Sequence, residues 1–232
     1  MALQTAVRAY APSDVDAIAE HDRLLDRIAT LVFADTIVLA QPLTPTSNPA
    51  LFLHELVPFF AMVSLTCRRF FEAGLPLRGA ISLGGFVIRE SCFAGEAVLQ
   101  ALKLERRLEF SGCALEDKTG RAIVGAVKMM SPEWDVSIGS RYRRLLFFTD
   151  APTKTGVEWM ALVRWGDPFT EWGYFPDSPP DFCERAFRAH SKQLDKRAAD
   201  KLAHTIALLE TSRLFPQGET PATLSETPAP SA

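Results

Sequence analysis

Hydrophobic and polar positions alternate with helical spacing in some parts of the chain and with strand-like spacing between them. Ser13 and Asp16 have the spacing of a capping box, and apolar residues then recur every three or four positions, which predicts a helix that ends near Ala29. The next segment, TLVFADTIVLA, is rich in β-branched and aromatic residues and predicts a strand or a tight hairpin. Residues 41–50 contain three prolines and predict a loop.

The middle of the chain predicts two helices with short strands between them. Residues 51–73 have apolar side chains on most sides, which predicts a well-buried helix despite Pro58, with Gly74 at its C-terminal end. The segment PLRGAISLGGFVIRES predicts two short strands that form a hairpin around its Gly-Gly dipeptide. A second buried helix is predicted for 95–108 and a strand for 110–115.

The C-terminal part predicts a second hairpin and one long helix. The segments LLFFTD and VEWMALVRW predict two strands on either side of a turn that contains Pro and Gly. Residues 181–213 predict a single amphipathic helix, and the Pro/Thr/Ser/Ala-rich residues 216–232 predict a disordered tail. We therefore expect one α+β domain over residues 1–215, with a motif core at about 30–116 and the hairpin and helix at about 141–213.

Composition places the chain among globular proteins. It has 232 residues, of which 47% are hydrophobic and 23% charged, and its formal net charge is −3. This charge favours neither DNA nor an anionic membrane as a partner. The longest apolar runs are interrupted before they reach the length that spans a bilayer, and no signal-peptide pattern opens the chain, so a cytoplasmic location is expected. Four scattered cysteines are expected to be buried free thiols.

Candidate chemistry concentrates on Asp35. The sequence has no P-loop, no GxSxG and no HExxH motif, and its four histidines lack metal-ligand spacing. Asp35 lies inside the apolar run FADTIVLA, where a carboxylate is costly to desolvate unless it is paired or binds a metal. Two interpretations stay open: Asp35 caps a turn between two short strands, or its oxygens bind a hard divalent cation that bridges phosphates.

Three segments together resemble a known family. The segments are FADTI from Phe33 to Ile37, RGAISLG from Arg78 to Gly84, and GEAVLQALKLE from Gly95 to Glu105. In this order and spacing they resemble the class III nucleotide cyclase homology domain. The likeness is greatest to the compact bacterial pyrimidine cyclases of the Pycsar antiphage system. It covers roughly residues 30–116, half of the chain.

The resemblance implies a fold, a reaction and a set of site residues. The fold would be a ferredoxin-like βαββαβ palm that acts as a homodimer with sites at the subunit interface. The reaction would convert a pyrimidine nucleoside triphosphate, with UTP favoured, to a 3′,5′-cyclic mononucleotide and pyrophosphate as an antiviral signal. Two Mn²⁺ or Mg²⁺ ions would assist it. Asp35 matches the family's metal aspartate in the central hairpin, Arg78 a position that could contact phosphate, and Lys103 the position of a transition-state arginine. Two alternatives stay open: Arg78 forms a surface salt bridge at the start of a strand, and Lys103 is an exposed helix residue.

Two positions depart from the family pattern. Leu99 stands where many purine cyclases have an asparagine, which favours the pyrimidine subgroup. The family's first metal aspartate lies on an opening strand, but residues 1–12 contain no acidic residue, and Asp14 and Asp16 are explained as helix-capping residues. A second hypothesis therefore stands beside the first: a cyclase-fold protein that binds nucleotide or a partner without turnover.

Overall fold

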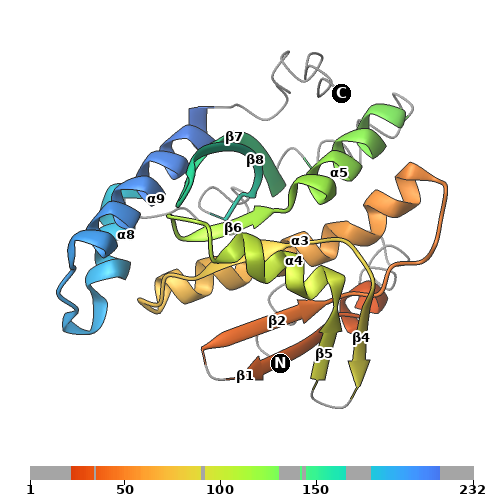
Figure 1. Cartoon of the computed structure of the whole chain (residues 1–232), viewed down its shortest axis with the longest axis horizontal. Helices are drawn as coiled ribbons and strands as arrows, with labels where there is room; N and C mark the ends of the chain where they lie inside the picture. Colours follow the sequence, from red (N-terminus) through yellow and green to blue (C-terminus); the bar gives the residue numbers. More distant parts are fainter. Residues whose placement is uncertain are drawn as a thin grey trace.

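The computed structural model describes residues 22–33, 35–89, 92–130, 142, 145–165 and 179–214. The predicted tail at 216–232, the acidic residues Asp14 and Asp16 and most of the first predicted helix lie outside them. The described strands are β1 Ala29–Phe33, β2 Thr36–Ala40, β3 Arg78–Ile81, β4 Phe86–Arg89, β5 Cys92–Gly95, β6 Gly112–Leu115, β7 Leu146–Thr153 and β8 Gly156–Val163 (Figure 1). The helices are α3 Pro49–Glu72, α4 Glu96–Glu105, α5 Asp117–Met129, α8 Pro179–Arg188, the 3₁₀ turn η3 Ala189–Ser191, and α9 Lys196–Leu214.

The described strands form one four-stranded sheet and two separate hairpins. The sheet has the order β3-β6-β8-β7, in which β3 and β6 run parallel and the other neighbours run antiparallel. The hairpins are β1–β2 and β4–β5, and β4–β5 packs on α4. The predicted α+β class with a mixed sheet and packed helices is confirmed.

The sheet separates two hydrophobic clusters because successive side chains of a strand point to opposite faces. On β6, Cys113 and Leu115 join the larger cluster with α3, α5 and α8, whereas Ala114 joins the smaller one. The smaller cluster also contains Leu104 of α4 and Leu208 of α9. Helix α9 borders both clusters, because its Leu202 and Leu209 belong to the larger one.

Helix α3 begins and ends where local signals predict. The Asn48 side chain accepts hydrogen bonds from the first backbone amides of the helix, and Pro49 occupies the first turn. At the other end, Gly74 has a φ of 74°, and its amide and that of Leu75 bond back to Phe71 and Phe70. Among the described helices only α3 is long and apolar enough to cross a membrane, but 61% of its apolar window is buried inside the protein, as in a core helix.

Glu55 ties the loop before α3 to this helix. Its carboxylate accepts hydrogen bonds from the Thr44 amide (2.8 Å) and hydroxyl (2.6 Å) and from the Arg27 guanidinium (3.1 Å). Burial by itself raises the pKa of Glu55, but the hydrogen bonds from Thr44 and Arg27 outweigh burial, and the pKa is lowered. The loop at 41–48 is thereby held against the core.

The predicted hairpin around Gly84 and Gly85 is wrong. Strand β3 pairs in parallel with β6, which follows 30 residues later, and β4 pairs instead with β5. The prediction considered only the nearest apolar segment as a partner for β3. In the fold, α4 crosses over and returns the chain to β3, so that β6 pairs with β3 in parallel. Only Ala97 and Leu104 of α4 are buried, so this helix is less buried than predicted.

The single long helix predicted for 181–213 is also wrong. The chain ends α8 at Arg188 and turns through His190 and Ser191, whose φ angles of 59° and 57° are left-handed. This turn packs on the C-terminal end of α3, where the His190 ring nitrogen lies 3.0 Å from the Ala73 carbonyl. Packing against α3 therefore interrupts an otherwise helical apolar pattern.

Two smaller expectations also change. Helix α5, at Asp117–Met129, was not predicted at all. All four cysteines are free, but only three are buried, because Cys92 is exposed on the β4–β5 hairpin. Burial raises the pKa of the Cys67 and Cys183 thiols to about 12.

Candidate functional site

Asp35 lies in the turn of the β1–β2 hairpin, and its carboxylate is exposed. The Thr36 hydroxyl donates to Asp35 Oδ1 at 3.3 Å, and Phe33 pairs with Thr36 across the turn. The turn explains how an acidic residue is accommodated within an apolar run: the strands on either side are half-buried, while the tip faces solvent. The placement is the one that the turn interpretation predicts.

The described residues do not fit a two-metal site. No group of three or more histidine, cysteine, aspartate or glutamate side chains within the described ranges is arranged to hold a metal ion. Asp35 alone supplies one carboxylate, whereas Mg²⁺ and Mn²⁺ sites use several oxygen ligands in a defined geometry. Asp35 therefore offers a single ligand, and no catalytic step through a metal is derived from it.

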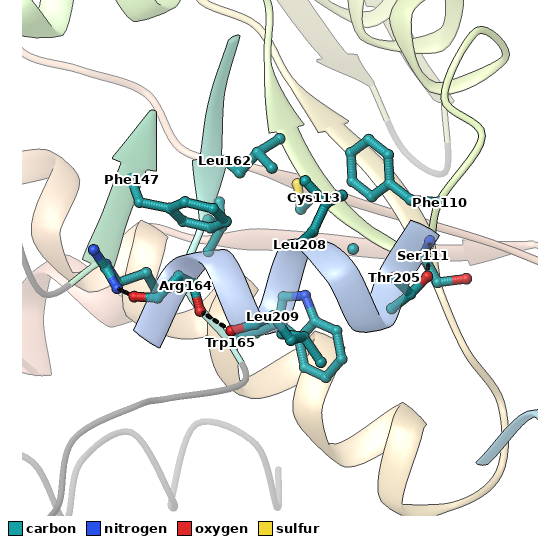
Figure 2. A pocket seen from close by; sticks show the side chains of 13 residues that line it. Phe110, Ser111, Cys113, Phe147, Leu162, Arg164, Trp165, Thr205, Leu208 and Leu209 are labelled. Carbon is teal, nitrogen blue, oxygen red and sulfur yellow. Dashed lines mark hydrogen bonds between the residues drawn. The ribbon is translucent and has the colours of Figure 1, made fainter. Parts of the chain in front are cut away.

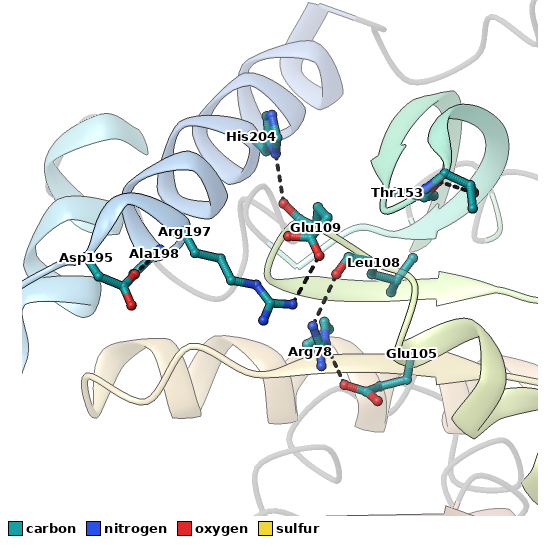
Figure 3. Close-up of polar contacts among 10 residues, drawn as sticks. Arg78, Glu105, Leu108, Glu109, Thr153, Asp195, Arg197, Ala198 and His204 are labelled. Carbon is teal, nitrogen blue, oxygen red and sulfur yellow. Dashed lines mark hydrogen bonds and ion pairs between the residues drawn. The ribbon is translucent and has the colours of Figure 1, made fainter.

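Arg78, the first residue of β3, is bound by other parts of the same chain. Its Nε donates to Glu105 Oε1 at 2.5 Å, and its Nη1 donates to the Leu108 carbonyl at 3.2 Å (Figure 3). Arg78 and Glu105 each expose 24% of their side chains, so the pair is largely shielded from solvent. Two of the three family-like segments are thus joined by an ion pair, and two of the three Arg78 guanidinium nitrogens donate to protein groups.

Lys103 lies on the exposed side of α4. Within the part of the chain that the structure describes, no carboxylate forms an ion pair with it. Its neighbours Leu99 (59% exposed) and Leu102 (37% exposed) are also turned outward. The structure therefore brings Arg78 together with Glu105, but it does not gather Asp35, Arg78 and Lys103 into one cluster bridged by hydrogen bonds or ion pairs of described residues.

Several cations that the sequence did not place together lie around residues 106–111, the segment that follows α4. We call Arg78, Lys154, Arg197 and Lys201 the basic cluster. Arg197 of α9 pairs with Glu109 (Nη2 to Oε1, 3.3 Å), and His204 Nδ1 lies 2.9 Å from the Glu109 carbonyl oxygen (Figure 3). Lys201 lies on the same face of α9, one turn beyond Arg197. Burial lowers the pKa of Lys201, and the charges of Arg78, Arg197 and Lys154 lower it further, whereas Glu109 opposes the shift.

The cavity under α9 is too small for a nucleotide. It lies between β6, β8 and α9 and has a volume of about 10 Å³, the scale of a single water molecule (Figure 2). The Arg164 guanidinium at its edge donates to the Leu146 carbonyl at 3.3 Å and to the Ser212 carbonyl, and it stacks 5.2 Å from the Phe147 ring. These contacts join β7, β8 and the end of α9, so this part of the described fold is structural.

No model of a known protein family matches the chain, and neither does any curated protein or solved structure. The candidate site therefore depends on the geometry of its own residues.

Sequence reasoning missed the basic cluster for a physical reason. Its members come from β3, the β7–β8 turn and α9, which are separated by about 40 to 120 residues along the chain. The spacing of Arg197 and Lys201 is the one local signal, because residues four apart share a helix face. That spacing could not indicate that Arg78 and Lys154 lie beside the same face.

Proposed function

We propose that this chain is a cyclase-like protein that binds a pyrimidine nucleoside triphosphate, with UTP favoured, without turning it over. The ordered family-like segments support a cyclase-type palm, and the contact between Arg78 and Glu105 is consistent with two of these segments serving one fold. We infer the absence of turnover from the contacts that Arg78 makes within the chain. Its Nε and Nη1 are already bound to Glu105 and Leu108, and a largely shielded guanidinium is costly to release.

A second candidate is turnover by the same domain, namely cyclisation of the pyrimidine nucleoside triphosphate with release of pyrophosphate. One specific observation favours it: the Asp35 carboxylate is exposed at a hairpin tip, and the Thr36 hydroxyl is the one described side chain bonded to it. A carboxylate left this open is available to a ligand. In this case Arg78 would exchange Glu105 for a phosphate oxygen, and Lys103 would be free to approach the same ligand.

Both candidates include a homodimer. Helix α4 exposes Leu99 and Leu102, and the neighbouring strand β4 exposes Val87 (63%) and Ile88 (38%). Large apolar side chains that are exposed on neighbouring elements are typical of an interface, although Val87 and Ile88 point to opposite faces of β4. A second copy would cover this surface, and replacing Leu99 by serine should then shift the sedimentation of the purified chain from dimer to monomer.

One experiment tests the function and separates the two candidates. The purified full-length chain is titrated calorimetrically with UTP, CTP, ATP and GTP in Mn²⁺ or Mg²⁺, and the same mixtures are analysed for cyclic mononucleotide and pyrophosphate by mass spectrometry. The matched control is Asp35→Asn, which removes the charge of an exposed side chain and leaves its size unchanged.

The proposal predicts saturable UTP binding and no cyclic product from any of the four nucleotides. Cyclic product from UTP that disappears in Asp35→Asn would establish the second candidate instead. If no nucleotide binds and none is converted, both candidates are refuted.

A further inference from the structure

The segment after α4 is a meeting point of three elements. The backbone amide of Glu109 donates to the Pro152 carbonyl at 3.1 Å, and the amide of Lys154 donates to the Arg107 carbonyl at 2.8 Å, so the β7–β8 turn is fastened to the segment. On the other side, the amide of Ser111 donates to the Thr205 hydroxyl of α9 at 3.0 Å. These bonds hold the turn, the segment and one face of α9 in fixed positions.

Four cations are arranged around this segment, and they outnumber the carboxylates. Arg78 comes from β3, Lys154 from the β7–β8 turn, and Arg197 and Lys201 from α9. Arg78 pairs with Glu105 and Arg197 with Glu109, which leaves a net charge of +2 within the group. The nearby Arg107 is neutralised by its own ion pair with Glu158 and does not change this balance.

Lys154 and Lys201 are the members whose charges are not matched, and Lys201 is the less exposed of the two. Its side chain is half-buried, and no described carboxylate lies within ion-pair distance of its ammonium. Arg197 lies one helical turn away, where a like charge is destabilising. Burial and the neighbouring cations both lower the pKa of Lys201, with only Glu109 opposing them. The fold thus holds the Lys201 ammonium close to other positive charges of the same chain. An anion bound beside Lys201 would reduce this repulsion.

Several donors of the group remain available to such an anion. The structure gives no hydrogen-bond partner among the described residues to the ammonium groups of Lys201 and Lys154, to Nη2 of Arg78, or to Nε and Nη1 of Arg197. Ammonium and guanidinium groups are the side-chain donors that bind phosphoryl oxygens, and here they come from three neighbouring elements. A net charge of +2 matches a phosphoryl group, which carries about −1.5 to −2 at neutral pH.

We propose that Arg78, Lys154, Arg197 and Lys201 form a binding site for a phosphoryl group between α9, the β7–β8 turn and the start of β3. The site requires no contribution from Asp35 and does not depend on the nucleotide-binding function proposed above. The phosphoryl group is either free inorganic phosphate or part of a nucleotide, and the two sources share the same recognition chemistry.

The test uses the purified full-length chain and three proteins: wild type, Lys201→Met and Lys118→Met. Lys118 is an exposed lysine of α5, which packs on α3 and β8, so its substitution removes the same charge elsewhere. Inorganic phosphate is titrated by calorimetry at low salt, with potassium chloride of matched ionic strength as the reference, and thermal unfolding is recorded with and without phosphate.

The site predicts that phosphate binds wild type and Lys118→Met alike and raises the Tm of both. Lys201→Met should bind phosphate at least about tenfold more weakly, because a charge-assisted hydrogen bond is lost. Its Tm without phosphate should equal or exceed that of wild type, since a repulsive charge has been removed. That result also shows that the variant is folded.

A phosphate response that is absent from wild type, or equal in all three proteins, would overturn the site. Lys154→Gln provides a second variant, which should weaken phosphate binding without loss of fold because its side chain is exposed. UTP added at saturation distinguishes the sources. If UTP prevents phosphate from binding, the site takes the phosphoryl group of a nucleotide. If UTP and phosphate bind at the same time, the site takes free phosphate.

Discussion

The ion pair between Arg78 and Glu105 allows a quantitative prediction about the role of Arg78. At an effective dielectric constant of about 20, two unit charges about 4 Å apart attract by about 4 kcal/mol, and desolvation and side-chain ordering remove most of this gain. Because each side chain exposes 24% of its surface, we expect a net coupling of about 1–2 kcal/mol. Arg78→Met should cost about 2–3 kcal/mol, since Glu105 and the Leu108 carbonyl both lose a donor.

A double-mutant cycle measures this coupling directly. Urea unfolding of wild type, Arg78→Met, Glu105→Gln and the double variant gives four free energies of unfolding. The effect of the double variant minus the sum of the two single effects is the coupling energy of the pair. The control is Arg121→Met, which breaks an ion pair with Asp117 whose side chains are 75% and 70% exposed, and it should change the free energy of unfolding far less. A coupling near zero, with Arg78→Met as mild as the control, would refute this assignment of Arg78 to a stabilising ion pair.

Three further predictions concern single positions. Gly74→Ala should destabilise the protein by at least about 2 kcal/mol, because the φ of 74° is strained for alanine and the new Cβ would lie 2.2 Å from the Cβ of Ala189 in η3. The control is Gly125→Ala, which adds a methyl group in open space on α5 and should stabilise the protein by about 0.5–1 kcal/mol. Urea unfolding measures both changes. The lowered pKa of Glu55 contributes stability above its unfolded pKa of about 4.3, and this contribution is lost as the pH falls through the folded pKa. Glu55→Gln should therefore cost about 1 kcal/mol at pH 7 and clearly less near pH 3.5, and an equal cost at both pH values would contradict the assignment. Only Cys92 should react rapidly with a thiol reagent in the native protein, because the other three thiols are buried and burial raises their pKa. All four thiols should react after denaturation. Rapid reaction of more than one thiol in the native protein would contradict the burial of these cysteines.

Features whose signals lie within a few neighbouring residues could be predicted from the sequence alone. The helix from Pro49 to Glu72 with Gly74 after it and the β7–β8 hairpin are confirmed, and TLVFADTIVLA forms the hairpin that was one of its two predicted structures. In each case the strand propensity, the cap or the turn is encoded next to the element that it specifies. The exposed position of Asp35 in a turn was one of two interpretations that the sequence left open, and the structure places Asp35 as the turn interpretation predicts.

Pairing and charge clustering were decided by the tertiary structure. Strand β3 pairs with β6 rather than with the adjacent β4, and the C-terminal helix is interrupted at His190 because that turn packs on α3. Likewise, Lys201 acquires its electrostatic environment from Arg78 and Lys154, which are distant along the chain. Periodicity and capping report the environment of a residue over about one or two helical turns, whereas strand partners and Coulomb interactions depend on distances that exist only after the chain has folded.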